Sequence, residues 1–264
     1  MPNKKVAIVT GASGGIGLAT ATLFSQKGYA VYGLSRKPYE SGPVHHIPTD
    51  VTDEAAVKQA VDAVIAAEGH VDVLICNAGF GISGAVEFTE LEDAKRQFDV
   101  NFFGVVNCVK AALPHMRAAR AGHILCVSSV AAVLAIPFQT FYSAAKASIN
   151  AFCAALANEV RPYNIHVAAL MPGDIKTGFT AAREKSLAGV EAYPALPRSV
   201  ATMEHDEQHG MEPMAIAQAL YRLACKRSLK ASYTAGIQYK LFVVLRKFLP
   251  IRLVNWLVGI LYAK

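Results

Sequence analysis

The sequence has few charged residues and no Cys-x-x-Cys pair, and each shortage excludes a class of protein. Charged residues make up 17% of the 264 residues and hydrophobic residues 53%, which is not the composition of a disordered chain. The five cysteines form no Cys-x-x-Cys pair and are too few to cross-link a chain this long, so we expect a reduced, cytoplasmic setting. The length suits one α/β domain of about 250 residues, and we expect a single domain over 1–264.

Segments suited to secretion or to crossing a membrane are also missing. The apolar run at 6–9 is far shorter than the core of a signal peptide. The uncharged stretch 124–145 contains Ser128, Ser129 and a proline, so it cannot be one lipid-facing helix. We interpret it as a buried strand followed by a loop.

Acidic residues are absent from the last part of the sequence. Residues 213–264 hold nine Lys and Arg and no Asp or Glu, whereas residues 1–212 sum to −3, so the net charge of +6 is a property of the C-terminal part. These basic residues alternate with apolar ones and no recognition motif accompanies them, so no nucleic-acid partner is expected. The tail 241–264 is an apolar and basic extension that must bury itself. Packing on the domain or on a second subunit is the leading interpretation, while contact with a lipid surface and a lid over a substrate pocket stay open.

What the sequence does have is a regular alternation of short apolar runs and longer stretches with helical spacing. Expected strands lie at 5–10, 30–34, 71–76, 123–128 and 166–171. Expected helices lie at 16–27, 54–68, 91–116 and 142–161, another helix begins near Pro213, and a last strand lies near 232–239. Buried strands that alternate with helices predict an α/β fold, with a parallel sheet covered by helices on both faces.

The segment 174–212 breaks this alternation. It is rich in charge and proline, and we expect an irregular lid loop over the substrate. His205 and His209 are four residues apart within it, a spacing that can suit a metal. We interpret the surrounding residues as a polar loop and find no third ligand, so no metal site is expected.

A glycine-rich turn follows the first expected strand. It runs Gly11-Ala12-Ser13-Gly14-Gly15-Ile16-Gly17 and leads into the first expected helix. Small residues there let the pyrophosphate of a dinucleotide approach the backbone and bind the N–H groups at the helix start. A tight turn without a ligand is the alternative, and the strand before the turn and the helix after it make that alternative the weaker one.

The second expected strand ends in Ser35-Arg36-Lys37. Folds that bind NAD commonly place an acidic residue here, where it binds the ribose hydroxyls, whereas an arginine can pair with a 2′-phosphate. Arg36 therefore favours NADP(H) over NAD(H). A solvated surface arginine is the alternative.

Tyr142 and Lys146 lie four residues apart, on one face of the helix expected at 142–161. An ammonium group near a phenol favours the phenolate and lowers the tyrosine pKa toward the range where proton transfer is efficient. Such a pair can equally be ordinary helix surface. Ser129 follows the strand expected at 123–128, at the edge where open α/β sheets bind ligands, and this position favours the catalytic interpretation.

Together with further elements, these residues resemble the short-chain dehydrogenase/reductase family. The similarity runs from about residue 5 to residue 239. Its elements, in chain order, are the glycine turn with Gly11, Gly15 and Gly17, then Asp50-Val51, Asn77-Ala78-Gly79, Asn101, Ser129, Tyr142-x-x-x-Lys146 and Pro172-Gly173-Asp174-Ile175-Lys176-Thr177. The resemblance implies a Rossmann-type, doubly wound, seven-stranded parallel sheet and an NADPH-dependent enzyme that transfers hydride between nicotinamide and a carbonyl or alcohol.

The resemblance also implies a role for each motif. Tyr142 would exchange a proton with the substrate oxygen, which Ser129 would polarise. Lys146 would bind the nicotinamide ribose and lower the Tyr142 pKa, and Asn101 would hold a water that links Lys146 to solvent. The residues expected to bind the cofactor are Gly11, Ser13, Gly15, Ile16, Gly17, Ser35, Arg36, Asp50, Val51, Asn77, Ala78, Gly79, Tyr142, Lys146, Pro172, Gly173, Ile175 and Thr177. Gly14 stands where many NADPH-using members carry a second basic residue, so selectivity for the 2′-phosphate depends on Arg36.

Apolar residues flank the motif positions and predict a hydrophobic ketone, aldehyde or secondary alcohol as substrate, such as a sterol-like, retinoid-like or long-chain lipid. They are Phe80, Ile82, Ala135, Ile136, Phe138 and Phe141. A 3-oxoacyl reductase is one alternative, although reductases of acyl-carrier-protein substrates commonly stop after the last strand. A cofactor-binding regulator without turnover is another. Because the family commonly pairs subunits through the helices expected at 91–116 and 142–161, we expect a homodimer or homotetramer.

Overall fold

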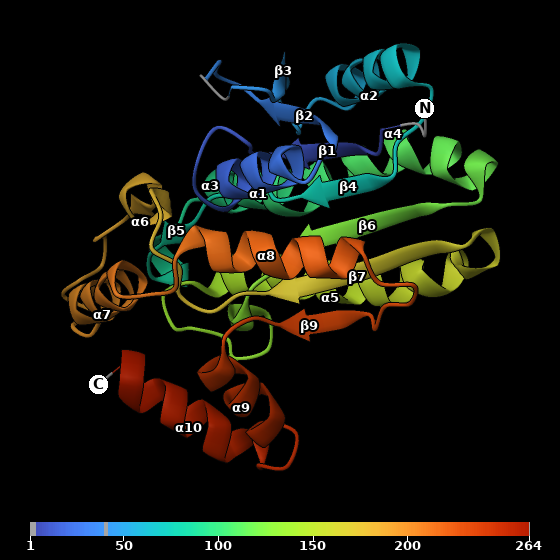
Figure 1. Cartoon of the computed structure of the whole chain (residues 1–264). Helices are drawn as coiled ribbons and strands as arrows, with labels where there is room; N and C mark the ends of the chain where they lie inside the picture. Colours follow the sequence, from blue (N-terminus) through green and yellow to red (C-terminus); the bar gives the residue numbers. More distant parts are fainter. Residues whose placement is uncertain (1–3, 40–41, 264) are drawn as a thin grey trace.

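A parallel sheet forms the centre of the computed structural model, which describes residues 4–39 and 42–263 (Figure 1). Within those residues the sheet has seven strands, in the order β3-β2-β1-β4-β6-β7-β9. The strands are β1 (Val6–Thr10), β2 (Ala30–Ser35), β3 (His45–Pro48), β4 (Val73–Cys76), β6 (Gly122–Val127), β7 (Ile165–Met171) and β9 (Ser232–Thr234). Because β1 lies inside the sheet and the chain winds outward in both directions, this is the doubly wound Rossmann arrangement, and the predicted fold is confirmed. The ends of the domain expected over 1–264, residues 1–3 and Lys264, lie outside the described residues.

Two apolar clusters, one on each face of the sheet, explain why the central strands are apolar throughout. Alternate residues of β1 point to opposite faces, so Val6 and Ile8 join one cluster and Ala7 and Val9 the other. The first cluster is completed by α2 (Glu54–Glu68), α4 (Gly104–Ala119) and α5 (Thr140–Glu159). The second is completed by α1 (Gly15–Gln26) and α8 (Pro213–Ala224). Helices therefore cover both faces and leave the carboxyl ends of the strands free for a site.

The helix expected at 91–116 is interrupted in the structure. It consists of α3 (Leu91–Phe98), a π-helical turn at Asp99–Phe103 and then α4. A π turn holds one more residue than an α turn, and such turns often accompany functional sites. The strand expected at 232–239 was also wrong in extent: β9 ends at Thr234, and after Gly236, whose φ is 89°, the chain enters α9 (Ile237–Leu245).

The segment 174–212 is not the irregular loop that its composition predicts. It contains α6 (Phe179–Ala182), β8 (Glu184–Lys185), which pairs with β5 (Ile82–Ser83), and α7 (Leu196–Gln208). His205 therefore lies on α7 and His209 directly follows its last residue, with their rings stacked 4.3 Å apart. Among the described residues no group of three metal-ligating side chains comes together.

The C-terminal residues form a helical hairpin beyond β9. Its helices are α9 and α10 (Ile251–Tyr262), drawn in red in Figure 1, and α10 packs against α7. We call α9, α10 and the turn between them, residues 237–262, the C-terminal hairpin. None of the helices in the described part of the chain is both long enough and apolar enough to span a bilayer.

Candidate active site

The carboxyl ends of the central strands border a cavity of about 770 Å³. It brings together nearly all of the residues that the sequence predicts for cofactor and catalysis. In its wall are Gly11, Ser13, Gly15, Ile16, Ser35, Arg36, Asp50, Val51, Asn77, Ala78, Gly79, Ser129, Tyr142, Lys146, Pro172, Gly173, Ile175 and Thr177. Gly17 and Asn101 lie behind the wall and support it.

The glycine turn is packed so tightly that side chains are excluded. Gly11 and Gly15 have φ values of +65° and +52°, which L residues other than glycine rarely adopt. A Cβ on Gly17 would lie 2.1 Å from the carbonyl oxygen of Gly11. By contrast, a Cβ on Gly14 would have no atom within 4 Å. The turn therefore leaves backbone exposed to the cavity at the start of α1, which fits the pyrophosphate of a dinucleotide.

The loop after β4 is tied to this turn by hydrogen bonds. The Thr10 hydroxyl oxygen accepts from the backbone N–H groups of Asn77 at 2.9 Å and Ala78 at 3.0 Å. The Asn77 side-chain amide donates to the Thr10 carbonyl at 3.0 Å. The glycine turn and the loop after β4 therefore form one rigid unit at the cavity, which we call the glycine cradle.

Arg36 and the Asp50-Val51 pair lie at one end of the cavity. Arg36 is exposed to solvent at the end of β2. The Asp50 carboxylate accepts from the backbone and hydroxyl of Thr52 at 2.9 and 2.8 Å, while the Val51 carbonyl accepts from Asn107 at 3.0 Å. These residues fit an adenosine group. Arg36 supplies a positive charge at the same end of the cavity.

Tyr142, Ser129 and Lys146 meet at the middle of the cavity. Burial raises the pKa of Tyr142 to about 12, and a hydrogen bond with the Ser129 hydroxyl lowers it in part. The Lys146 ammonium donates to the Val127 carbonyl at 2.9 Å and lies 5.7 Å from the centre of the Tyr142 ring. Burial lowers the Lys146 pKa to about 8. Burial is the largest cause of the Tyr142 pKa shift, and the lowering by Lys146 stays a prediction.

Asn101 is completely buried in the π-helical turn. Its side-chain oxygen accepts from the Phe80 N–H at 2.9 Å and its amide donates to the Phe80 carbonyl at 2.8 Å. A Cβ on Gly79 would lie 2.8 Å from the Asn101 oxygen and 3.5 Å from Lys146 Nζ, so Gly79 is the spacer between the two side chains. Asn101 therefore braces the loop after β4, and its predicted role in holding a water stays a prediction.

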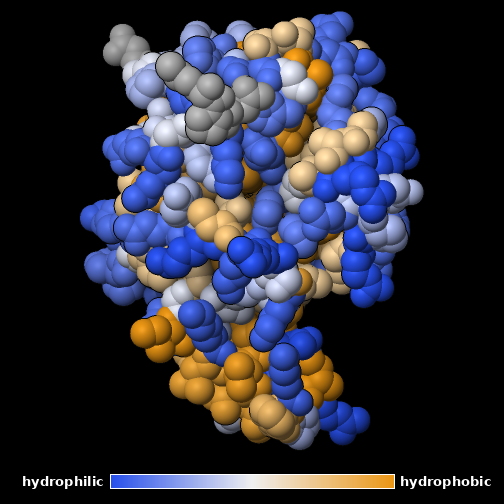
Figure 2. Space-filling model, turned by 45° about the vertical axis from the view of Figure 1, so that its right-hand side comes forward, coloured by the Kyte–Doolittle hydropathy of each residue, from blue (hydrophilic) through white to orange (hydrophobic). Residues whose placement is uncertain are grey.

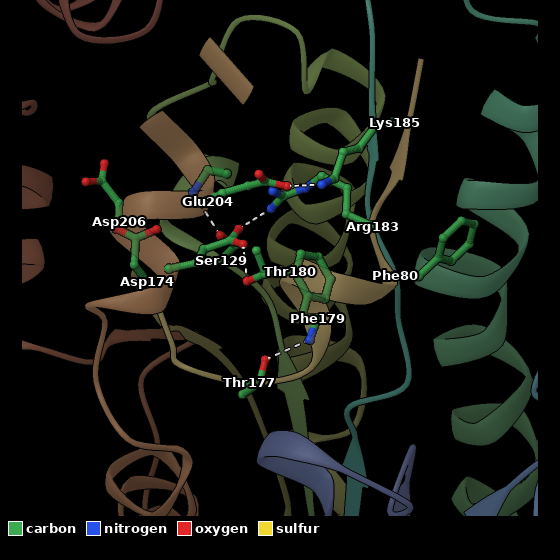
Figure 3. Close-up of polar contacts among 12 residues, drawn as sticks. Phe80, Ser129, Asp174, Thr177, Phe179, Thr180, Arg183, Lys185, Glu204 and Asp206 are labelled. Carbon is green, nitrogen blue, oxygen red and sulfur yellow. Dashed lines mark hydrogen bonds and ion pairs between the residues drawn. The ribbon is translucent and has the colours of Figure 1, made fainter. Parts of the chain in front are cut away.

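A buried ion pair near the catalytic residues was not predicted from the sequence. Arg183 forms an ion pair with Glu207, whose other oxygen accepts from the Thr180 hydroxyl at 2.7 Å. Figure 3 shows that Arg183 and Lys185 both point toward carboxylates of α7, where Lys185 pairs with Glu204. The segment looked like an irregular loop in the sequence, so nothing indicated that these charges would meet.

The cavity wall also contains the carboxylate of Asp174, which lies near Glu207. The Tyr239 hydroxyl donates to it at 2.6 Å, and burial raises its pKa. Within the described residues it forms no ion pair at the 4.0 Å limit for such contacts. Tyr239 itself packs on Gly173, where a Cβ would lie 2.2 Å from the tyrosine ring. The C-terminal hairpin is thereby joined directly to the Pro172-Gly173 turn.

Much of the remaining cavity wall is apolar, although Arg96, Gln139 and Glu184 also line it. Of the flanking residues named from the sequence, Phe80 and Ile136 line the cavity, whereas Ile82, Ala135, Phe138 and Phe141 do not. The C-terminal hairpin contributes Phe242, Val258, Leu261 and Tyr262. Sequence reasoning left this use of the tail among the open alternatives, and the structure shows that its inner face lines the cavity.

Comparison with known proteins agrees with this geometry. Residues 5–188 match the family model described as short chain dehydrogenase. The chain belongs to the short-chain dehydrogenase family. A 3-ketodihydrosphingosine reductase of Bacteroides thetaiotaomicron is 40% identical over 98% of both chains. Dehydrogenase/reductase SDR family member 7B of Xenopus tropicalis is 31% identical over 93% of this chain and 82% of its own.

The solved structure of a short-chain dehydrogenase from Streptomyces avermitilis superposes with a TM-score of 0.86, at 27% identity and 94% coverage of both chains. Membership in the short-chain dehydrogenase family makes this protein an oxidoreductase that uses NAD(P)(H) on a small molecule. The predicted family, fold and enzyme class are confirmed.

Proposed function

We propose that this oxidoreductase uses NADPH to reduce a long-chain, hydrophobic ketone, with Tyr142 as the proton donor. The observation that carries the proposal is the position of Tyr142 and Ser129, between the glycine cradle on one side and an apolar wall formed by the C-terminal hairpin on the other. A nicotinamide held by the cradle and an acyl chain held by the apolar wall would meet at these two hydroxyl groups.

The chemistry that the nicotinamide supplies when bound is hydride, delivered to the carbonyl carbon. Ser129 hydrogen-bonds and polarises the carbonyl oxygen, and Tyr142 gives that oxygen a proton. The products are a secondary alcohol and the oxidised cofactor. The raised pKa of Tyr142 keeps its proton in place near neutral pH, so that it can act as an acid. Lys146, with Asn101 and Gly79 behind it, positions the ribose and replaces the lost proton.

Selectivity for NADPH is proposed to depend on Arg36, which can form a bidentate pair with the 2′-phosphate. The wall around it contains Ser13, whose hydroxyl can donate to the same group, whereas the Ser35 hydroxyl donates to the Lys37 carbonyl at 3.0 Å. Gly14 brings no charge to this end of the cavity. A single arginine is expected to give a clear but not absolute preference for NADPH.

Two carboxylates near Tyr142, those of Glu207 and Asp174, favour an amino ketone among the candidate substrates. Glu207 is paired with Arg183, whereas Asp174 accepts from the neutral Tyr239 hydroxyl, forms no ion pair among the described residues and can pair with a substrate ammonium. The relative from Bacteroides is named for 3-ketodihydrosphingosine, a long-chain ketone with an amino group on the carbon next to the carbonyl. This compound is the first substrate to test.

The test is the initial rate of NADPH consumption with 3-ketodihydrosphingosine, a ketone of equal chain length without the amino group, and a short polar ketone. We expect the first to be fastest and Tyr142→Phe to lose about 10²–10⁴-fold in rate while still binding NADPH. The control is Tyr163→Phe, at a tyrosine outside the cavity wall. Turnover that survives in Tyr142→Phe would disprove the mechanism. Faster turnover on acyl-carrier-protein thioesters would favour the 3-oxoacyl reductase, and NADPH binding without any turnover would favour a regulator.

We further propose that the protein is a homodimer or homotetramer that pairs through α4 and α5. Phe102 of the π turn and Phe152 of α5 stack edge to face at 6.0 Å and join the two helices into one surface, which Phe103 extends with a half-exposed ring. Light scattering of the purified protein tests this proposal, and the mass of a single chain would contradict it.

A further inference from the structure

The outer face of the C-terminal hairpin carries a dense group of exposed apolar side chains. Ile237 is 89% exposed, Phe248 is 79% exposed and Ile251 is 57% exposed. We call this group the hairpin patch. Its members are Ile237, Leu241, Val244, Leu245, Phe248, Ile251, Leu253, Trp256 and Leu257. Figure 2 shows them as an orange surface at the bottom of the molecule, in contrast to the mostly blue surface above.

The patch is not a by-product of packing against the domain. In α10 the inward contacts are made by Val254, Val258 and Tyr262, which follow one another at intervals of four residues. Leu253, Trp256 and Leu257 lie on a different side of the same helix and remain exposed. α10 therefore has a second apolar face that the described residues leave uncovered, and α9 adds further exposed apolar side chains beside it. A continuous patch of this kind marks an interaction surface.

The positive charge of the hairpin indicates which kind of partner the hairpin patch can bind. Lys240, Arg246, Lys247 and Arg252 lie in the hairpin among the apolar residues, and residues 213–264 contain no Asp or Glu. Figure 2 shows blue side chains running beside the orange surface. A second hairpin would bring the same positive charges against these and would repel them. An anionic lipid surface satisfies both features, because its headgroups pair with the cations and its acyl chains bury the apolar side chains.

We propose that the hairpin patch docks on an anionic lipid surface. Its helices have 9 and 12 residues, and no described helix is suited to span a bilayer, so the hairpin lies in the plane of the interface. The opposite face of the hairpin lines the cavity through Val258 and Tyr262, so docking holds the cavity wall at the lipid surface. The docking stands apart from the proposed function, because it depends on the outer face of the hairpin and not on turnover.

The protein carries its own reporter for this docking, because Trp256 is its only tryptophan and is half-exposed within the patch. The experiment titrates the full chain with vesicles of phosphatidylcholine containing about 30% phosphatidylglycerol, and with vesicles of phosphatidylcholine alone. We expect a blue shift of Trp256 emission, quenching by brominated acyl chains, and binding at least about tenfold tighter to the anionic vesicles. Salt at about 0.5 M is expected to weaken the binding, since it screens exposed charges.

Variants separate the two features of the patch. Phe248→Ser and the double variant Lys247→Glu/Arg252→Glu are each expected to weaken vesicle binding about tenfold or more. Matched controls on the domain are Leu91→Ser, at a side chain 65% exposed, and Lys95→Glu/Arg117→Glu, both at exposed positions. The controls are expected to bind vesicles like the parent, and NADPH binding by every variant shows that it is folded.

Three results would overturn the proposal. A blue shift that depends on protein concentration without vesicles, together with a doubled mass by light scattering that Phe248→Ser abolishes, would make the patch an interface between two copies of the chain. Absence of quenching by brominated lipid would place Trp256 outside the bilayer. Equal binding by the parent and by Lys247→Glu/Arg252→Glu would remove the electrostatic basis of the docking.

Discussion

The two sides of the cavity are built in opposite ways. The glycine cradle is made of backbone, with Gly11, Gly15 and Gly17 so closely packed that a Cβ on Gly17 would lie 2.1 Å from a carbonyl oxygen. The C-terminal hairpin is made of side chains, and the hydroxyls that join it to the rest are those of Tyr239, bonded to Asp174 at 2.6 Å, and Tyr262, bonded to Asp206 at 3.3 Å. The glycine cradle must always fit the same kind of cofactor, so this side of the cavity tolerates little change. The substrate side can vary without disturbing the sheet, which is where members of one family can differ.

The largest effect is expected at the cradle, where Gly17→Ala is compared with Gly14→Ala. The new Cβ at Gly17 must displace the Gly11 backbone, whereas the Cβ at Gly14 meets no atom within 4 Å. We expect Gly17→Ala to weaken NADPH binding by more than about 100-fold and to destabilise the fold by roughly 1–3 kcal/mol. Calorimetric titration with NADPH and thermal unfolding measure the two effects. Similar losses in both variants would show that the cradle is less rigid than its packing indicates.

Arg36→Ala is expected to reduce the preference of the cradle for NADPH without damaging it. Loss of a charged hydrogen-bonding partner costs roughly 1.5–3 kcal/mol, so the KM for NADPH should rise about 10–100-fold. The KM for NADH serves as the internal control and should stay within about twofold of the parent value. If both cofactors weaken equally, Arg36 supports the loop and does not read the phosphate.

Lys146→Met is expected to stabilise the cofactor-free protein near neutral pH. Burial lowers the Lys146 pKa from 10.5 in the unfolded chain to about 8, so the folded state loses a proton that the unfolded state still binds between those values. The parent is therefore destabilised below about pH 8 and regains that stability as the pH rises toward 10.5. The variant should be more stable by on the order of 1–3 kcal/mol at pH 7, since its lost hydrogen bond to Val127 offsets part of the gain. Urea unfolding at pH 7 and pH 10.5 measures this difference, and an equal gain at both would point to packing instead of charge.

The smallest change tests the hairpin. Tyr239→Phe removes the hydrogen bond to the Asp174 carboxylate, which costs roughly 1.5–3 kcal/mol in unfolding free energy. We expect the KM for a long-chain ketone to rise a few-fold, with NADPH affinity unchanged. Tyr163→Phe is the matched control. A loss of NADPH affinity in Tyr239→Phe would mean that the hairpin supports the cofactor side too, and the contrast between the two sides would fail.

The sheet and the cradle were predictable because their signals are local. A strand that must be covered on both faces is apolar throughout, as in β1, and a turn that must admit phosphate needs glycine at 11, 15 and 17. The strand β3 was missed because its sequence, His-His-Ile-Pro, is short and half-exposed at the sheet edge, and it therefore lacks the apolar run of the inner strands. Tyr142 and Lys146 were found because their spacing along a helix fixes their face.

The parts that escaped prediction depend on distant contacts. Pro197 lies in the first turn of α7, where proline suits a helix, but among so many charges it was interpreted as a sign of a loop. Arg183 and Glu207 are separated by 24 residues and meet only because α7 folds back over α6. The start of α9 was assigned to a strand because the strand expected near 232–239 was continued through Gly236, whereas the chain turns at Gly236, with a φ of 89°, and enters α9.

The π turn at Asp99–Phe103 has a consequence for how this gene can change. It amounts to one inserted residue in an otherwise continuous helix, and each residue of a helix turns the chain by about 100°. Deleting one codon within the turn would restore an unbroken helix from α3 to α4 and leave the sheet intact. The same deletion would rotate the preceding segment relative to α4 and move Asn101 away from Phe80 and Gly79. An insertion or deletion that looks silent for the fold is therefore a severe change for the site.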